Sequence, residues 1–503
     1  MDGAKDHATD YAMVYSRASA GLDAPLVRVE THLANGLPAF QVVGMPETAV
    51  RESRDRVRSA LLTSCFAFPQ RRITVNLAPA DLPKGGSRFD LPIALGILAA
   101  SGQLPAAGLG AWEFIGELAL DGGLRPVPGV VPVSIATADA GRRLALPEAA
   151  AGEAARVPGS RVFCAPDLLS LCAGLRGTRP LQPATAAMAA APPPAPDLAE
   201  VIGQPGARRA LEIAAAGGHH LLFTGPPGTG KTMLASRLPG LLPPPEPRLA
   251  LETLALHSLA SRGSVPDRPF RAPHHSATAA ALVGGGSVPR PGEISLAHGG
   301  VLFLDELPEF GRHTLDMLRE PLEAGRVTLA RARHRVSFPA RFQLVAAMNP
   351  CPCGYDGDPD HACRCTPEQV NRYRQRVSGP LLDRIDLHVP VPRPPPRDLL
   401  AQAARGEGSA PVRERVLLAR NRQRARQGRC NAELDDEALA RYCPLGDADR
   451  ELLAQATERL GLSPRALKRC LRVALTLADL AGAPAPGRAQ LVEALGYRQP
   501  AAE

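Results

Sequence analysis

The stretch that decides the fold is residues 221–232, which read LLFTGPPGTGKT. A short apolar run typical of a buried β-strand leads into G-x-x-x-x-G-K-[ST], and a segment of helical composition follows. Glycines in such a loop let backbone N–H groups wrap a phosphate chain, and the start of the next helix adds favourable partial charge. This order is improbable by chance, so the sequence predicts a nucleotide-binding loop (P-loop) made of Gly225, Pro226, Pro227, Gly228, Thr229, Gly230, Lys231 and Thr232.

A second apolar run, VLFLDE at residues 301–306, ends in two carboxylates. Alone, it would be equally typical of an acidic helix N-cap after a strand. With a P-loop upstream, we expect Asp305 to hold Mg²⁺ through water together with Thr232, and Glu306 to polarise the attacking water. Lys231 is expected to neutralise the β- and γ-phosphates of ATP.

Three further residues extend this prediction. Asn349 follows the apolar strand pattern at residues 344–348, and its side chain is expected to orient the attacking water. Arg384 stands before a strand-like run in LLDRIDLHV, and Arg465 stands at the start of a helix in SPRALKR. Phosphoryl transfer needs cations for transition-state charge, although from the sequence alone a surface ion pair or a helix-face charge is the better explanation for each arginine.

Composition divides the chain of 503 residues, 45% of them hydrophobic, into three blocks that are long enough for cores of their own. Residues 11–177 mix strand-like and helical runs and predict an α+β domain. A Pro/Ala-rich linker spans 178–197. Residues 198–392 alternate strands and helices, as a parallel sheet requires, and residues 398–503 are helical.

The second block resembles AAA+ ATPases, and FRAPHHSATAAALVGGGSVPRPGEISLAHGGVLFLDELPEF, AAMNPCPCG and SGPLLDRIDLHV are similar to their magnesium-chelatase-like branch. Nearly the whole chain resembles the ComM/YifB family of that branch. The resemblance implies an α/β P-loop AAA+ core with a helical C-terminal domain, and a hexameric ring with ATP between subunits. It also implies that Arg384 is an arginine finger in trans and Arg465 is the residue called sensor 2.

The resemblance implies an ATP hydrolase that acts as a DNA helicase and promotes branch migration during natural transformation. Two alternatives remain open at this point. One is a chelatase-type ATPase that drives Mg²⁺ insertion through partner proteins, and the other is a scaffold whose ATPase switches assembly. The first block favours the motor over the chelatase, because chelatase motor subunits are expected to lack it.

PKGGSRFDLPIALGILAASGQL and IGELALDGGLRPVPGVVPVSIA in the first block resemble the proteolytic domain of Lon. A Lon-type protease uses a serine nucleophile activated by a lysine. The register of the motif puts Arg88 and Val131 at these two positions, so we predict a Lon protease-like domain without proteolytic activity. Ser87 is one position away and Lys84 lies in the preceding loop, which leaves a protease as the minor alternative.

Residues 351–365 read CPCGYDGDPDHACRC, a C-x-C-x₉-C-x-C pattern. Four thiolates fit a closed tetrahedral Zn²⁺ site, and the Gly-, Asp- and Pro-rich loop between them has no core of its own. The C-x-C spacing is tighter than the usual C-x₂-C, so four reduced cysteines on a loop remain the alternative. The predicted zinc ligands are Cys351, Cys353, Cys363 and Cys365.

Between the two acidic residues and Asn349, the segment 325–343 carries alternating arginines, namely Arg331, Arg333 and Arg335. In one strand they would share a face, which suits a DNA backbone, and in related rings this region forms a hairpin in the pore. A solvated strand face is equally plausible. A net charge of +8 permits an anionic partner, and DNA, single-stranded or branched, is the predicted one.

Two other segments invite the same question. PHHSATAAALVGGG, at residues 273–286, is a second candidate for the pore by resemblance. The arginines of residues 413–427, RERVLLARNRQRARQ, form a helical stripe that either contacts phosphate or is an exposed face, and we favour the exposed face.

The longest apolar runs are too short for a membrane span, and the N-terminus MDGAKDHATD is polar and lacks a signal-peptide core. We therefore expect a cytoplasmic protein with no membrane partner. In that reducing compartment, metal binding is a better explanation for clustered cysteines than disulfides.

Overall fold

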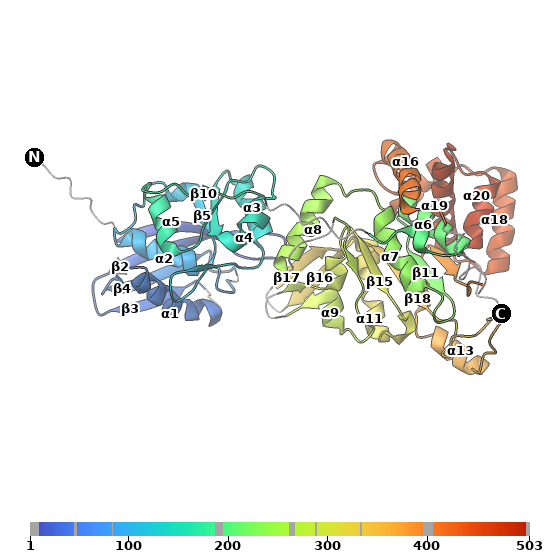
Figure 1. Ribbon diagram of the computed structural model, residues 1–503, viewed down its shortest axis with the longest axis horizontal. Helices are drawn as coiled ribbons and strands as arrows, with labels where there is room; N and C mark the ends of the chain where they lie inside the picture. Colours follow the sequence, from blue (N-terminus) through green and yellow to red (C-terminus); the bar gives the residue numbers. More distant parts are fainter. Residues whose placement is uncertain are drawn as a thin grey trace, which may run out of the picture.

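The computed structural model describes residues 10–44, 48–82, 84–186, 195–260, 267–286, 289–331, 334–395 and 406–498. Three parts follow one another along the long axis: an N-terminal α/β part, a central sheet with its helices, and a C-terminal group of helices (Figure 1). Among the described helices, none combines the length and the apolar character that crossing a bilayer requires.

The N-terminal part is built on an eight-stranded mixed sheet in the order β10-β9-β8-β5-β1-β2-β4-β3. Alternating burial along β1 and β2 shows that one face of the sheet is covered and the other is more open. Helix α2, DLPIALGILAA, is apolar around its whole circumference and is buried at every residue. The strands are β1 (Tyr11–Arg17), β2 (Leu26–Ala34), β3 (Ala39–Val43), β4 (Arg72–Ala78), β5 (Trp112–Phe114), β8 (Arg143–Pro147), β9 (Val162–Ala165) and β10 (Gln182–Pro183).

The remaining N-terminal elements are short strands and helices around this sheet. They are β6 (Glu117–Leu118), β7 (Leu124–Arg125), α1 (Thr48–Thr63), α2 (Asp90–Ala100), α3 (Val130–Asp139), α4 (Glu148–Ala154) and α5 (Leu168–Leu175).

The central part is a five-stranded sheet in the order β12-β15-β18-β11-β19, and every neighbouring pair is parallel. Successive residues of β15 enter different cores: Val301 and Phe303 face one layer, and Leu302 and Leu304 face the other. Covered faces on both sides explain why its strands read as continuous apolar runs. The strands are β11 (Leu221–Thr224), β12 (Phe270–Arg271), β15 (Val301–Leu304), β18 (Gln343–Met348) and β19 (Leu387–Pro390).

Helices and two hairpins surround the central sheet. The helices are α6 (Pro205–Gly217), α7 (Lys231–Leu241), α8 (Pro247–Leu259), α9 (Ala279–Val283), α10 (Glu293–Leu296), α11 (Arg312–Asp316), α12 (Arg319–Ala324), α13 (Pro367–Arg374) and α14 (Gly379–Leu382). The hairpins pair β13 (Gly284–Gly285) with β14 (Arg290–Pro291), and β16 (Arg326–Arg331) with β17 (His334–Pro339).

The C-terminal helices share a core with the central sheet, because Val416 and Val473 belong to the same apolar cluster as Leu221. The arginine stripe of α16 is only partly the exposed face that was expected: Arg413 and Arg422 are exposed, but two other arginines bond within the protein. Arg420 is buried and donates to the carbonyl of Ala215, and Arg426 pairs with Asp479 at 2.7 Å. The helices are α16 (Ser409–Gln427), α17 (Asp436–Tyr442), α18 (Asp447–Leu460), α19 (Pro464–Ala481) and α20 (Arg488–Gly496).

The C-terminal end of α8 joins the central part to the N-terminal part. Gly129 donates its N–H to the carbonyl of Ser258 at 3.0 Å, and Val131 donates its N–H to the Ser258 hydroxyl at 3.3 Å. Leu254 of α8 packs in the same apolar cluster as Val131. The start of α3 is therefore capped by a residue from another part of the chain.

Candidate nucleotide site

The P-loop lies at the carboxyl ends of the parallel strands, where β11, β15 and β18 all finish. Lys231 donates to the carbonyls of Gly225 and Pro226 at 2.7 and 2.8 Å and to Asn349 Oδ1 at 3.1 Å. Burial lowers the pKa of the Lys231 ammonium. A cation and an amide predicted from separate stretches of sequence are therefore in contact.

The residues predicted to hold Mg²⁺ also meet at this edge. The Thr232 hydroxyl donates to Asp305 Oδ2 at 2.6 Å, across 73 positions of sequence. The Thr232 side chain is exposed and Asp305 is half-buried, so both oxygens are open to a ligand. A hydroxyl and a carboxylate in contact beside a phosphate loop are the donors that Mg²⁺ takes in such sites.

Glu306 has an unusual backbone, with φ of +52° in the left-handed region. Its N–H donates to Asp305 Oδ1 at 2.9 Å, which stabilises that conformation. Its carboxylate lies 3.0 Å from Nδ1 of His275, and the ring of His274 lies 4.1 Å from that of His275. Sequence reasoning missed this contact, because nothing local to the His-His pair indicates a carboxylate partner.

The two predicted arginines meet each other on a shared carboxylate. Arg384 lies 2.5 Å from Glu323 Oε1, and Arg465 contacts the same oxygen. Arg384 precedes the amino end of β19, whereas the P-loop follows the carboxyl end of the adjacent parallel strand β11. Both arginines are therefore separated from the P-loop of their own chain. Partial burial alone would raise the pKa of Glu323, but the two guanidinium groups lower that pKa.

A buried polar cluster supports the same amino edge. Asp386 accepts from the backbone N–H of His220 at 2.9 Å and from Arg469 at 2.7 Å. Burial alone would raise the pKa of Asp386, but the Arg469 charge and the neighbouring His219 hold that pKa well below its usual range. Burial also lowers the pKa of His220 to about 4. The two bonds of Asp386 connect the central sheet to α19, while Nε of Arg469 is buried without a hydrogen-bond partner among the described residues.

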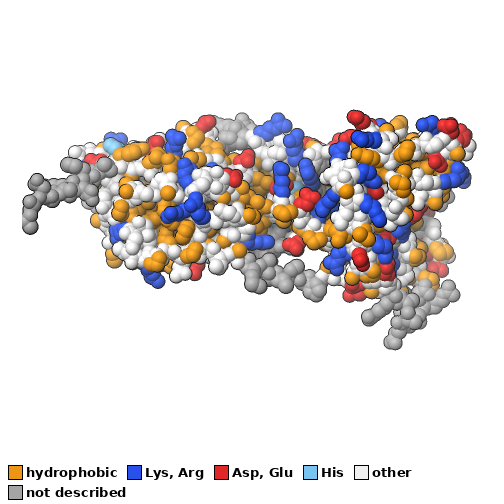
Figure 2. Space-filling model, turned by 90° about the horizontal axis from the view of Figure 1, so that it is seen from above, with side chains coloured by type: hydrophobic (Ala, Val, Ile, Leu, Met, Phe, Trp, Pro, Cys, Tyr) orange, Lys and Arg blue, Asp and Glu red, His pale blue; other side chains and the backbone are white. Residues whose placement is uncertain are grey.

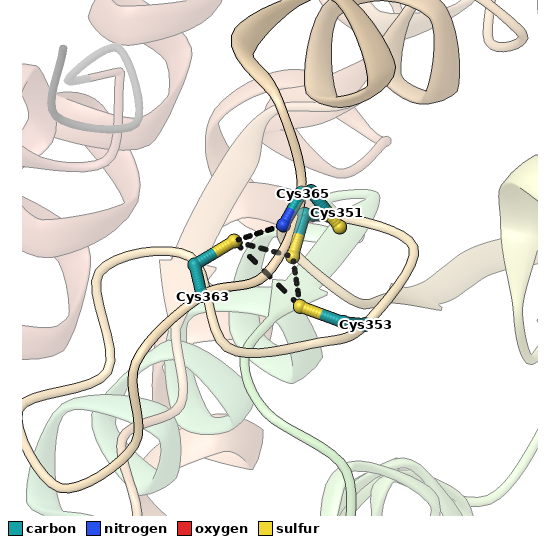
Figure 3. Close-up of side chains that lie close together, drawn as sticks. All are labelled: Cys351, Cys353, Cys363 and Cys365. Carbon is teal, nitrogen blue, oxygen red and sulfur yellow. Dashed lines mark hydrogen bonds between the residues drawn. The ribbon is translucent and has the colours of Figure 1, made fainter.

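The four predicted zinc ligands converge in one loop (Figure 3). Their sulfurs all lie within 4.8 Å of one another, and the Cys351 sulfur lies 3.4 Å from that of Cys353 and 3.7 Å from that of Cys363. The backbone N–H of Cys365 donates to the Cys363 sulfur at 3.4 Å. This set of soft donors could hold a metal ion.

Of the arginines predicted to contact DNA, Arg331 and Arg335 lie on the two strands of a hairpin, as in the related rings, so the expectation that they share one strand was wrong. Arg331 is the last residue of β16 and pairs with His334 of β17. Arg335 of β17 pairs with Ala330 of β16. The chain reverses between them because β16 and β17 are antiparallel. The Arg335 side chain is exposed, while Arg333 and the Arg331 side chain lie outside the described part of the chain.

In the N-terminal part, the two residues that kept a protease alternative open have different partners. The Lys84 ammonium donates to the carbonyls of Gly44, at 2.8 Å, and Pro79. The Ser87 hydroxyl donates to Glu117. Arg88 is buried and donates to the Pro128 carbonyl at 2.8 Å, next to the start of α3, and burial lowers its pKa to about 10.

Comparison with known proteins gives matches over most of the chain. The family described as "Magnesium chelatase, subunit ChlI" matches residues 197–399, and its C-terminal family matches residues 406–498. The family described as "Subunit ChlI of Mg-chelatase" matches residues 29–150. A family described by the chelatase subunit therefore matches the first block as well. The presence of this block does not support a DNA motor over a chelatase, contrary to expectation.

Curated relatives match at nearly full length. The competence protein ComM of Haemophilus influenzae is 52% identical over 497 residues, covering 97% of each chain. The uncharacterized protein YifB of Salmonella typhimurium is 51% identical over 492 residues, again with 97% of each chain covered. An uncharacterized protein of Mycobacterium bovis is 45% identical over 496 residues, which cover 96% of this chain and 98% of its own. The chain belongs to the ComM/YifB family of magnesium-chelatase-like AAA+ proteins.

Proposed function

We propose that this protein is an ATP-driven DNA motor that assembles into a hexameric ring and promotes branch migration, as in the integration of incoming DNA during natural transformation. The observation that carries the proposal is the gathering of Lys231, Thr232, Asp305 and Asn349 at one edge of a parallel sheet. Those groups supply what phosphoryl transfer needs: a cation for the phosphates, two Mg²⁺ ligands and a polar group for the attacking water. The near full-length similarity to a competence protein supports DNA as the substrate.

The cofactors in this proposal are ATP and Mg²⁺ at the P-loop and Zn²⁺ at the four cysteines, in a cytoplasmic protein. Asp305 and Thr232 would hold the Mg²⁺ ion, which would neutralise charge on the phosphates when bound, and Glu306 would accept a proton from the attacking water. Arg384 and Arg465 act on the nucleotide of the adjacent subunit. Their place at the amino edge, away from the P-loop of their own chain, supports an action in trans.

The N-terminal part acts without proteolysis in this proposal. A Lon-type protease needs its serine hydroxyl beside a lysine amine that accepts the proton at the moment of attack. Ser87 and Lys84 have separate partners, and the register of the Lon motif puts Arg88, a buried guanidinium, at the position of the nucleophile. The contact of Ser258 with the start of α3 supports a structural role for this part, in carrying force or in fixing the ring.

The DNA surface in the proposal includes the tip of the β16–β17 hairpin with Arg331, Arg333 and Arg335. One face of the molecule carries many Lys and Arg side chains over its central part (Figure 2). Contacts of this kind act on phosphates and carry no base sequence, which suits a motor that moves along any DNA.

The test measures ATP-dependent strand displacement and branch migration on forked and four-way DNA. Wild type is expected to show both activities, and Lys231→Ala is expected to lose them together with ATP turnover. Electron micrographs of the same samples are expected to show six-membered rings with ATP and forked DNA. Activity retained by Lys231→Ala would contradict the motor.

The second candidate is a chelatase-type ATPase that works through partner proteins, and the family descriptions across the chain favour it. It predicts that DNA does not stimulate ATP turnover and that ATP turnover does not drive movement along any DNA structure. A porphyrin-binding partner that stimulates turnover would then replace DNA as the ligand.

A further inference from the structure

The cysteine loop lies directly against the P-loop. Gly354, between Cys353 and Cys363, is buried and has φ of +87°. A Cβ atom at this position would lie 2.6 Å from Cδ of Pro227 and 3.8 Å from Cγ of Asn349. Carbon atoms in contact lie about 3.5–4.0 Å apart, so only a glycine lets the loop approach the P-loop this closely.

The same loop is tied to the residue predicted to orient water. Asn349 is separated from Cys351 by one residue, and the Tyr373 side chain bonds to the backbone of Asn349. Arg374 donates to the Pro350 carbonyl at 3.2 Å and to Asp356 at 2.7 Å. The loop therefore contacts two parts of the nucleotide site: the P-loop at Pro227 and the end of β18 at Asn349.

The loop lacks a means of holding its own shape by apolar packing. Between the two cysteine pairs it reads GYDGDPDHA, and within residues 351–365 only Cys351 and Gly354 are buried. The sulfurs of Cys351, Cys353 and Cys363 are 3.4–3.7 Å apart. Ligands about 2.3 Å from a tetrahedral Zn²⁺ ion stand about 3.8 Å from each other, so this spacing is close to that of a zinc site.

We propose that Zn²⁺ bound by the four cysteines braces the nucleotide site, holding Gly354 against Pro227 and fixing the start of the loop at Asn349. The inference rests on the proposed function, since it assumes that the P-loop binds ATP. It goes further by making the metal site part of the machinery for binding nucleotide. Metal binding supplies folding energy to such loops, so loss of the ion releases the brace.

A pair of glycines in the loop tests the brace without touching a ligand. Gly354 and Gly357 both have a positive φ, +87° and +76°, but a Cβ at Gly357 meets nothing within 4 Å. Gly354→Ala and Gly357→Ala therefore share the backbone strain, and only Gly354→Ala adds a clash with Pro227. We expect Gly354→Ala to keep its zinc and to bind a fluorescent ATP analogue about tenfold more weakly than Gly357→Ala. Equal nucleotide affinity in the two variants would overturn the brace.

The metal is tested by elemental analysis of protein purified without chelator. Wild type is expected to contain one zinc per chain, and the double variant Cys363→Ser/Cys365→Ser is expected to lose zinc and at least tenfold in nucleotide affinity. The control is Cys65→Ser, because Cys65 is exposed and outside the loop. Wild type without zinc, or with iron in its place, would overturn the zinc site.

Thermal unfolding of each variant separates local from global damage, since the brace predicts loss of nucleotide affinity in protein that is still folded. A wild type that binds no nucleotide would overturn the proposed function and the brace together. A wild type that binds and hydrolyses ATP, with Gly354→Ala unchanged relative to Gly357→Ala, would overturn the brace alone.

Discussion

The two edges of the central sheet differ in how their charged groups are satisfied. At the carboxyl edge, Thr232 and Asp305 contact each other but remain open to solvent. At the amino edge, Asp386 is completely buried and bonded to Arg469 and His220. The first arrangement leaves lone pairs available to a ligand, and the second leaves few.

The amino edge nevertheless carries two arginines that, like the groups of the carboxyl edge, could bind a ligand. Arg384 and Arg465 share a single carboxylate, Glu323. A guanidinium group pairs with phosphate as readily as with carboxylate, so a nucleotide could replace Glu323 as the partner of these arginines. The edge opposite the P-loop therefore holds both a structural cluster and a candidate anion site for an adjacent subunit.

The largest expected effect concerns Arg384. Arg384→Ala is expected to lower ATP turnover by about 10³-fold or more, because an arginine finger supplied in trans is worth roughly 10³–10⁵ in rate. Nucleotide affinity, measured on the same protein, is expected to change much less. Mixed assemblies of Arg384→Ala and Lys231→Ala subunits should regain turnover, since some interfaces then combine an intact P-loop with an intact arginine. Mixtures as inactive as the separate variants would place Arg384 outside the neighbouring site.

Asp386→Asn tests the structural half of the amino edge. Removing one partner of a buried ion pair typically costs about 3–5 kcal/mol, because the charge of Arg469 is left buried. Chemical denaturation is expected to report that loss in free energy of unfolding. The matched control is Asp447→Asn, whose carboxylate pairs with Arg450 but is 98% exposed, and it should cost less than about 1 kcal/mol.

The stability of wild type relative to Asp386→Asn should also depend on pH. The folded pKa of Asp386 lies well below its ordinary value, so its contribution is present above the unfolded pKa of about 3.9. That contribution is lost as pH falls through the folded pKa. The difference between the two proteins should therefore be constant at neutral pH and shrink in strong acid.

At the carboxyl edge, the His275 ring lies against Glu306, the carboxylate that is proposed to accept a proton from the attacking water. His275→Ala is expected to raise ATP turnover measured without DNA by a few-fold, because an exposed ion pair is worth about 0.2–1 kcal/mol and 1 kcal/mol is about fivefold in rate. His274→Ala is the control, since His274 bonds Ser276. Equal turnover in both variants would show that the pair does not restrain Glu306.

Local patterns predicted the carboxyl edge well, and the reason is physical. A buried parallel strand, a phosphate loop and a strand followed by acids are each encoded within about ten residues, and parallel strands bring their carboxyl ends together. The Lys231–Asn349 and Thr232–Asp305 hydrogen bonds follow from that geometry.

Interactions without a local signature were not predictable in the same way. Glu323 is 61 residues from Arg384 and 142 from Arg465, and no period or spacing connects them. The same is true of His275 with Glu306 and of Gly354 with Pro227. The arginine stripe of α16 shows the opposite error, since a surface pattern conceals Arg420, which is bonded inside the protein.

The smallest expected effect sharpens the comparison outside the sheet, at the β16–β17 hairpin. Arg335 is exposed there, and if it binds DNA it neutralises a phosphate and releases a counterion. Arg335→Ala should lower the slope of log affinity against log salt by about 0.7 for each phosphate of single-stranded DNA that is no longer neutralised, which is a change of a few-fold in affinity at moderate salt. Arg450→Ala is the control, because Arg450 is also exposed but lies on α18 with Asp447 as its partner. If both variants change the slope equally, the effect is one of net charge, and the hairpin has no special part in binding DNA. If only Arg335→Ala changes the slope, the hairpin carries a DNA contact that is separate from both edges of the sheet.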